Sequence, residues 1–296
     1  QTLALALESK EKEIRKWNSL VPIKPYGHKP PLYIVHGAGL NVLPFYAIAN
    51  NLDPGQPVYG LQAKGLDGIE TPLTSVEEIA AHYIKEILEH NPQGPYALAG
   101  YSFGGILAFE MAKQLKAVGK EVQKLIMFDT YAYLSDHKES WMVKLTNQIR
   151  YLIGKRVNDI QLLVNHPQTF KNIKLISLRK KKNNILKFLN FKNTQPQPEM
   201  LKTIKKIEAI NREASKHYVF KKYPGNLYLL RAKIRTNYIE DPVYLGWKPY
   251  VDNVNIIEVE GKHTTMFTPP HDKKFARVLQ EILDGNEVPP VRQHLE

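Results

Sequence analysis

One stretch of the sequence decides the fold: Tyr96-Ala97-Leu98-Ala99-Gly100-Tyr101-Ser102-Phe103-Gly104-Gly105. It starts with an apolar segment and leads into residues 106–118, which have the periodicity of a helix. Gly-x-Ser-x-Gly between a strand and a helix is typical of a strained turn that projects a serine hydroxyl above a sheet. Small residues at both ends of the pattern let the backbone turn tightly and a substrate approach. A glycine-rich turn with an ordinary capping serine is the alternative, but the flanking patterns favour a nucleophilic Ser102.

Short apolar segments alternate with helical patterns on both sides of this turn. Strands are expected at residues 32–35, 58–61, 96–99, 122–128, 226–230 and 254–259, and helices from about residue 44 and at residues 75–90, 106–118 and 276–283. Thr74 and Ser75 each precede a glutamate by three residues, the pattern of a capping box that begins a helix. Gly119 is expected to end the helix that follows the turn. Such alternation predicts an α/β protein with a mostly parallel central sheet and helices on both faces.

The composition excludes several function classes. The 296 residues fit one well-cored domain, with or without an appendage. No cysteine is present, which excludes disulfides, thiolate metal sites and a cysteine nucleophile. No apolar run approaches the ~20 residues that span a bilayer, and the start lacks the pattern of a signal peptide. We therefore expect a cytoplasmic protein without a membrane partner.

The positive charge of the chain is confined to one segment. The formal net charge is +12, but residues 144–222 alone hold nineteen Lys and Arg against four Asp and Glu. The rest of the chain is therefore slightly acidic. Since the charge belongs to one segment rather than to the whole molecule, we predict no nucleic-acid partner.

Three parts of the chain are expected to differ in role. Residues 1–27 suggest a short amphipathic helix and a proline-containing linker, and residues 28–296 form the main domain. Within that domain, residues 131–222 have no strand signal and interrupt the expected strands, which predicts a helical lid insertion of functional importance. Apolar residues of the insertion could line a channel for a substrate chain: Ile185, Leu186, Phe188, Leu189 and Phe191.

A serine nucleophile requires a general base, for which histidine is the expected residue. His263 follows the expected strand at 254–259 through a short loop, so its imidazole can reach the edge of the sheet. His271 and His294 also lie beyond that strand. His271 stands beside two prolines at the start of the last helix and is more typical of a cap or a surface group. We therefore predict His263 as the base.

The histidine in turn requires an acid that fixes its tautomer. Asp129 stands at the end of the expected strand at 122–128, which follows the helix at 106–118. This is the edge where open α/β sheets bind ligands. Glu240 and Asp241 follow a later strand and are the competing candidates. Asp129 is favoured, with Asp241 retained as the alternative acid.

Two backbone N–H groups are expected to hold the negative oxygen that forms during acyl transfer. One belongs to Phe103, directly after the serine, and the other to Ala38 in the loop at residues 36–39. A dinucleotide-binding interpretation of that loop fails because residue 42 is Val42 rather than glycine. No metal-binding motif is visible either, so neither a metal nor a bound cofactor is predicted.

Five segments closely resemble the type I thioesterase domains of nonribosomal peptide synthetases and related polyketide assembly lines. They are PLYIVHGAG at 31–39, VYGLQAKGLDG at 58–68, GYSFGG at 100–105, FDT at 128–130 and GKHTTM at 261–266. The resemblance covers about residues 20–285 and implies an α/β-hydrolase fold with Asp129 as the acid. It also implies that an acyl or peptidyl chain passes from the phosphopantetheine of a separate carrier domain onto Ser102. Release would then follow by hydrolysis or by macrocyclisation.

Some parts of the chain lie outside this family pattern or depart from it. Residues 2–7 and onward look like the tail of a carrier domain, without the serine that accepts phosphopantetheine. Lys262 stands before His263 where many relatives have a small or acidic residue, and the basic insertion matches no family pattern. Another enzyme of the same fold, a free-standing editing thioesterase or a carboxylesterase, is one alternative. An inactive basic binding module is another, of a different class.

Overall fold

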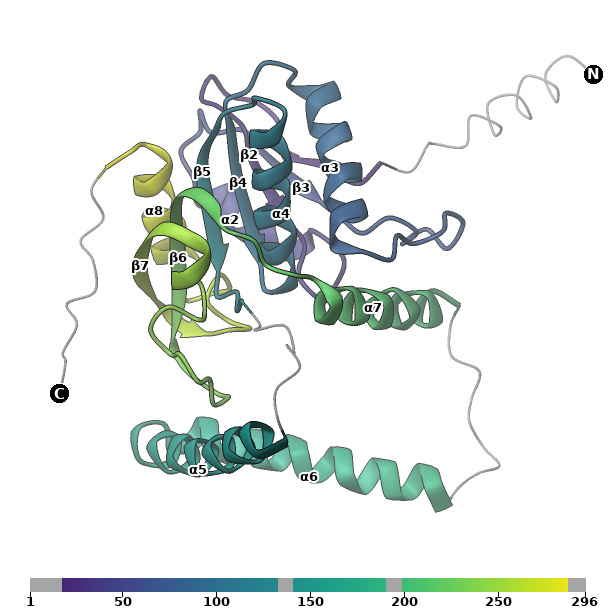
Figure 1. The fold of residues 1–296 in the computed structure, drawn as a ribbon, viewed down its shortest axis with the longest axis vertical. Coiled ribbons are helices and arrows are strands. Elements are labelled where there is room, and N and C mark those ends of the chain that lie inside the picture. The colour runs from purple at the N-terminus through teal and green to yellow at the C-terminus, as the bar shows by residue number, and fades with distance from the viewer. Residues whose placement is uncertain (1–17, 133–140, 190–198, 287–296) are drawn as a thin grey trace, which may run out of the picture.

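The computed structural model describes residues 18–132, 141–189 and 199–286 (Figure 1). Its centre is a seven-stranded sheet with the order β1-β3-β2-β4-β5-β6-β7. The strands are β1 (Leu20–Lys24), β2 (Leu32–Val35), β3 (Val58–Leu61), β4 (Tyr96–Tyr101), β5 (Val122–Phe128), β6 (Tyr223–Ile234) and β7 (Val251–Lys262). Every neighbouring pair is parallel except β1 with β3. The predicted mostly parallel sheet is therefore confirmed.

The start of the described chain differs from the expected boundary. Residues 20–24 were expected in a linker, but they form β1, which pairs antiparallel with β3 at the edge of the sheet. Leu20 and Val21 also pack against the two faces of the core. A strand as short as this, with Pro22 inside it, carries too weak a pattern to be distinguished from a linker.

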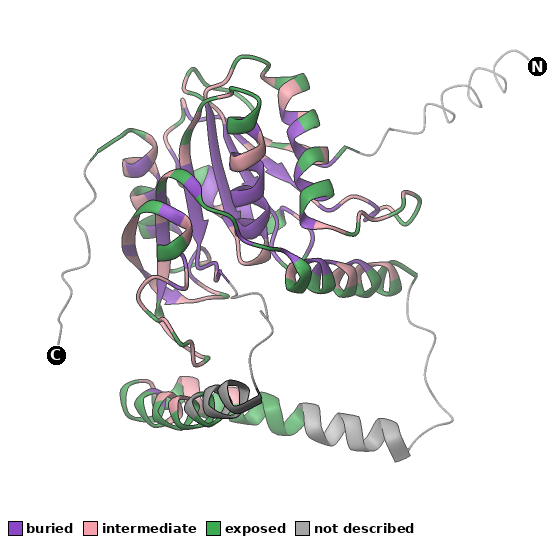
Figure 2. Cartoon of the chain, viewed as in Figure 1, coloured by how far each residue is buried: buried purple, intermediate pink, exposed green. Residues whose placement is uncertain are grey.

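Helices cover both faces of the sheet. The helices α3 (Val76–His90) and α4 (Phe103–Ala117) bury their apolar sides on one face, and α2 (Tyr46–Asn51) and α8 (Asp272–Leu283) on the other. The short 3₁₀ helices η1 (Leu43–Phe45) and η2 (Lys248–Tyr250) connect other elements. Figure 2 shows that the central strands are buried almost throughout. Both layers position the carboxyl ends of β2, β4, β5 and β7 at one edge.

The predicted helix boundaries are confirmed where capping chemistry was visible. At the start of α3, the Ser75 hydroxyl accepts the Glu78 N–H, and the Glu78 carboxylate accepts the Ser75 N–H. After α4, Gly119 has φ 75°, a conformation that glycine adopts without strain. Its N–H bonds to the carbonyl of Lys116 and ends the helix.

The insertion consists of helices in its described part. It contains α5 (Trp141–Asn165), α6 (Pro167–Leu189) and α7 (Glu199–His217), and no strand occurs among its residues that the structure describes. The pair α5 and α6 lies apart from the sheet, whereas α7 lies against the main body (Figure 1). Ile207 of α7 packs into a small apolar cluster with Leu40 and Leu66. The insertion is therefore divided between a helix that contacts the core and a helix pair that extends away from it.

A buried polar contact fastens the end of the insertion to the core. Tyr218, directly after α7, donates its hydroxyl to the Glu110 carboxylate of α4 at 2.6 Å. Lys113 neutralises the same carboxylate at 2.6 Å. Because Glu110 is almost fully buried, this contact fixes the distance between α7 and α4 more tightly than an exposed ion pair would.

None of the helices described by the structure is long and apolar enough to cross a membrane.

Candidate active site

Ser102 occupies the predicted sharp turn between β4 and α4. Its φ of 55° and ψ of −119° lie in a region that non-glycine residues rarely adopt, as expected for a strained elbow. A Cβ at Gly100 would collide with the carbonyl of Gly104, and a Cβ at Gly104 would collide with the carbonyl of His36. Both glycines are therefore required for the turn that exposes Ser102.

Asp129 and His263 are brought together at the same edge. Asp129 follows β5 and is fully buried, and its Oδ2 lies 2.8 Å from Nδ1 of His263, just after β7. A carboxylate can only accept here, so Nδ1 carries the hydrogen and the neutral ring leaves its Nε2 lone pair free. This tautomer is the one a general base requires. Their catalytic roles remain proposals.

The carboxyl of Asp129 is held in its charged form. Burial by itself would raise the pKa of this carboxyl, because a low dielectric disfavours the charge. The hydrogen bond from His263, the positive charge of Arg235 and the N–H of Ala232 act in the opposite direction and outweigh burial. The pKa of Asp129 therefore lies below its ordinary value, and the group is a carboxylate at neutral pH.

The ring of His263 is oriented by an aromatic neighbour. The Tyr101 ring stacks on it, with centroids 4.9 Å apart, and the Tyr101 hydroxyl donates to the carbonyl of His263 at 2.9 Å. Phe267 packs edge-on against the other side of Tyr101. Ser102 and His263 are not hydrogen-bonded to each other, and such catalytic contacts often tighten in the complex with substrate. Nothing in the sequence pattern identified Tyr101 as a support for the base.

The two predicted oxyanion donors, Ala38 and Phe103, line the same cavity as Ser102. The loop that carries Ala38 is fixed by His36, whose Nδ1 donates to the Gly37 carbonyl at 2.7 Å. Its Nε2 accepts the hydroxyl of Tyr83 at 2.9 Å. Burial lowers the pKa of His36 to about 4, and the bond to Gly37 opposes this only in part. His36 is therefore neutral, as this arrangement of one donor and one acceptor requires.

The competing residues serve other roles or lie elsewhere. Both oxygens of Asp241 accept backbone N–H groups, from Val243, Tyr244 and Gly246, so this carboxylate stabilises a loop and is not bonded to His263. Glu240 lines a different cavity. His271 stands at the N-cap position of α8 without a side-chain capping bond, as expected of a residue outside the site. His294 lies outside the described residues.

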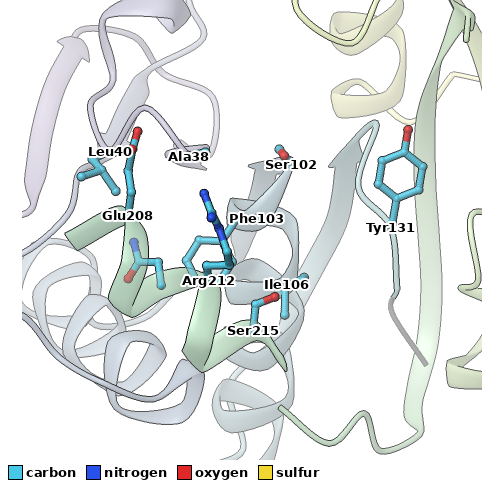
Figure 3. Close-up of a pocket in the computed structure, with 10 residues that line it drawn as sticks. Ala38, Leu40, Ser102, Phe103, Ile106, Tyr131, Glu208, Arg212 and Ser215 are labelled. Atoms are coloured by element: carbon cyan, nitrogen blue, oxygen red, sulfur yellow. The ribbon is translucent and has the colours of Figure 1, made fainter. Parts of the chain in front are cut away.

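A cavity of about 240 Å³ lies in front of Ser102. Ile106 and Phe103 form its floor on α4, and Tyr131 forms one wall. In Figure 3 the side chains of Glu208 and Arg212 rise from α7 toward Ala38 and Ser102. These charged residues were not predicted, although their spacing of four places them on one face of α7. The insertion therefore contributes to the site through α7.

Tyr131 also borders a second cavity of about 500 Å³, which extends to Asp241 and Leu245. A third cavity, of about 310 Å³, is lined by Gly154 and Val157 of α5 together with Arg235. Helix α5 thus approaches the loop after β6, and none of its described residues lines the cavity in front of Ser102. The side chains expected to form a channel lie outside the described residues: Ile185, Leu186, Phe188, Leu189 and Phe191.

The sequence matches a known family over the part of the chain that holds Ser102 and Asp129. Residues 30–174 match the family model described as "Thioesterase domain". This segment of the chain belongs to the thioesterase family. The predicted family resemblance and the α/β-hydrolase fold are therefore confirmed.

Curated relatives of the thioesterase domain are synthetases. The chain is 28% identical to "Nonribosomal peptide synthetase atqA" of Aspergillus terreus, over 90% of this chain and 29% of the relative. It is 27% identical to "Inactive atromentin synthetase invA3" of Paxillus involutus, over 95% of this chain and 29% of the relative. The chain thus spans under a third of the length of these relatives.

The fold also matches solved thioesterase domains. One is the NocB thioesterase domain in a covalent complex with a fluorophosphonate nocardicin G analog. The TM-score is 0.63 at 21% identity, and the match covers 89% of this chain and 99% of the other. At this identity the likeness establishes the fold.

The low pKa of the buried His36 makes the stability of the folded domain depend on pH. In the unfolded chain this histidine has the ordinary pKa of about 6.5, whereas in the folded protein its pKa is about 4. In this window the unfolded state holds more protons, so stability falls as the pH falls. We expect His36 to account for a loss of about 2 kcal/mol in the free energy of unfolding between pH 7 and pH 5.

Urea unfolding at the two pH values measures this effect. His36→Asn should show a weaker loss of stability on acidification than the unchanged protein, whatever its stability at pH 7. His28→Asn, at an exposed histidine, is the matched control and should keep the full loss. Identical pH dependence in His36→Asn and the unchanged protein would contradict a neutral, buried His36.

Proposed function

We propose that the chain is a serine thioesterase that releases an acyl or peptidyl chain from the phosphopantetheine thioester of a carrier domain, through an acyl intermediate on Ser102. One observation carries the proposal. The buried Asp129 is hydrogen-bonded to His263 at the sheet edge where the turn presents Ser102 to a cavity. Family membership and the synthetase names of the relatives favour this reaction over other acyl transfers.

The geometry supports acylation in the following way. His263 Nε2 takes the proton of Ser102 as the Ser102 oxygen attacks the thioester carbonyl. The carbonyl oxygen becomes negative and accepts the N–H groups of Ala38 and Phe103. Asp129 stabilises the imidazolium that forms on His263 without taking its proton. When the carbon–sulfur bond breaks, the imidazolium returns its proton to the thiol, and the acyl chain remains on Ser102.

Release reverses these roles. Water, or a hydroxyl or amine of the chain itself, attacks the acyl-enzyme while His263 takes its proton. The first nucleophile gives a free acid by hydrolysis, and the second gives a ring by macrocyclisation. In both cases Ser102 recovers its proton from His263, so the same residues serve either outcome.

The proposed partner is an acyl or peptidyl carrier domain. Carrier domains are commonly acidic and their pantetheine arm is attached through a negatively charged phosphate, whereas residues 144–222 are strongly basic. Opposite charges on the two surfaces would raise the rate of encounter. The phosphopantetheine belongs to the carrier, so no cofactor on this chain is part of the proposal.

Two alternatives have specific observations behind them. A free-standing editing thioesterase or carboxylesterase would use the same cavity, with its acid at the alternative position after the later strand. Asp241 stands there and is occupied by three backbone N–H groups, which disfavours this alternative. An inactive module has support in the name of a relative called inactive.

Labelling with a fluorophosphonate probe tests the nucleophile. We expect the unchanged protein to be labelled at Ser102 and Ser102→Ala to lose both the label and turnover of acyl thioesters, because no other hydroxyl is activated by His263. Ser215→Ala is the matched control, since Ser215 lines the same cavity from α7. It should be labelled normally. Failure to label the unchanged protein would favour an inactive module.

The acid is tested by two isosteric changes. Asp129→Asn should lower kcat by about 10³- to 10⁴-fold on a small soluble thioester, because an amide favours the wrong tautomer of His263. Asp241→Asn changes a carboxylate that only caps a loop, so it should leave kcat within a few-fold once folding is verified by circular dichroism. The opposite ranking of the two variants would identify Asp241 as the acid.

Charge removal in the insertion tests the partner. Neutral replacement of Arg179, Lys180, Lys181 and Lys182 should lower kcat/KM for a carrier-bound thioester by about 10-fold, because encounter loses long-range attraction. A small soluble thioester should react as before, and added salt should narrow the difference. The control replaces four basic residues of the main body: Lys85, Lys248, Lys273 and Arg277. Equal losses for both quadruple variants would contradict a docking role of the insertion.

A further inference from the structure

A buried cation lies against Asp129 on the side opposite His263. Nη1 of Arg235, one residue beyond β6, donates to Oδ1 of Asp129 at 2.7 Å. The same nitrogen donates to the hydroxyl of Tyr131 at 3.0 Å. The Arg235 side chain is only 17% exposed. A third charged residue therefore belongs to the pair of Asp129 and His263.

The guanidinium of Arg235 lacks the full set of hydrogen bonds that a purely structural ion pair would have. Its Nη2 is buried and has no hydrogen-bond partner, which costs free energy that a saturated site would avoid. Arg231, four residues earlier on β6, shows the ordinary arrangement. It is similarly buried, but it pairs with Glu258 of β7 and donates to the carbonyl of Pro242, away from Asp129. The position of Arg235 beside Asp129 therefore costs free energy, because one of its nitrogens is buried without a partner.

The two oxygens of Asp129 are divided between different partners. Oδ1 accepts Arg235 and the N–H of Ala232 at 3.0 Å, and only Oδ2 is left for His263. Two donors on Oδ1 prevent rotation of the carboxylate, so the lone pairs of Oδ2 stay aimed at Nδ1 of His263. A single backbone N–H would restrain this rotation less.

The remaining charges near His263 do not duplicate that of Arg235. Lys262 precedes it on β7, and Glu260 on the same strand is paired with Lys233 of β6 and Lys274 of α8. The other rings near His263 belong to Tyr101 and Tyr131, whose centroids lie 4.9 and 6.4 Å from that of the imidazole. Arg235 is thus the cation in direct contact with the acid among the residues that the structure describes.

We propose that Arg235 is a positioning residue that orients the Asp129 carboxylate toward His263 and limits how strongly that carboxylate attracts a proton onto the imidazole. Its effect on turnover rests on the proposed thioesterase function. The positive charge beside Asp129 repels a second positive charge on the neighbouring imidazole, so loss of Arg235 would favour proton uptake there. The bond to Tyr131 adds a mechanical link, because Tyr131 is a wall of the cavity in front of Ser102.

The charge of Arg235 and its hydrogen bonds to Asp129 and Tyr131 can be separated by substitution. Arg235→Gln removes the charge, and we expect kcat to fall about 10- to 100-fold and the acid limb of the kcat/KM profile to move about one unit to higher pH. Arg235→Lys keeps the charge but not the planar guanidinium whose Nη1 donates to both partners, so it should keep the acid limb in place and recover part of kcat. Arg231→Gln is the matched control and should leave the limb unchanged.

A second measurement does not depend on turnover. The titration of the His263 ring, followed by NMR, should move to higher pH in Arg235→Gln and stay in place in Arg235→Lys and Arg231→Gln. Movement of this titration in a protein that hydrolyses no thioester would contradict the proposed function and leave the role of Arg235 intact. An unmoved titration in folded Arg235→Gln, or an equal movement in Arg231→Gln, would overturn the inference about Arg235.

Discussion

The hydrogen bond between Asp129 and His263 is the interaction on which the proposed chemistry depends. It joins residues 134 positions apart, at the ends of β5 and β7. These strands are not neighbours, since β6 lies between them in the sheet. The bond is therefore possible only because parallel strands in register end together at one edge. Substitutions that shift β6 would separate the acid from the base, even where neither residue changes.

A buried carboxylate of this kind needs compensation, and the surrounding residues supply it. The N–H of Ala232 on β6 and the guanidinium of Arg235 both reach Oδ1, so the strand between the two partners also stabilises the charge. His36, in the loop that carries Ala38, is also buried but is kept neutral instead of charged. It is buried without a counter-charge and stays neutral, which lets it brace the loop of Ala38 by one donated and one accepted bond. The site thus holds one charged and one neutral buried group, each determined by its partners.

The insertion between β5 and β6 contributes unevenly to the site. The helix α7 is fastened to α4 through Tyr218 and Glu110, and it presents Glu208 and Arg212 to the cavity. Of the pair α5 and α6, helix α5 instead approaches the loop after β6, where Tyr238 lies against Gly154 and Tyr151. Several apolar side chains of this pair are exposed, among them Ile153, Ile160 and Leu178, and the described parts of both helices are largely green in Figure 2. Substrate selection by the insertion is therefore expected to differ between α7, which faces Ser102, and the outer helices.

The sequence by itself determined the features that depend on neighbouring residues along the chain. The elbow at Ser102, the capping of α3, the end of α4 at Gly119 and the alternation of strands and helices follow from local sterics and periodicity. The sequence favoured Asp129 over Asp241 as the acid but could not show their contacts. In the structure Asp241 accepts backbone N–H groups and Asp129 is bonded to His263. Strand β1, the support from Tyr101, the charged face of α7 and Arg235 also became visible only in three dimensions. Each of these depends on which distant segments the sheet and its helices bring into contact, and a local pattern carries no record of such contacts.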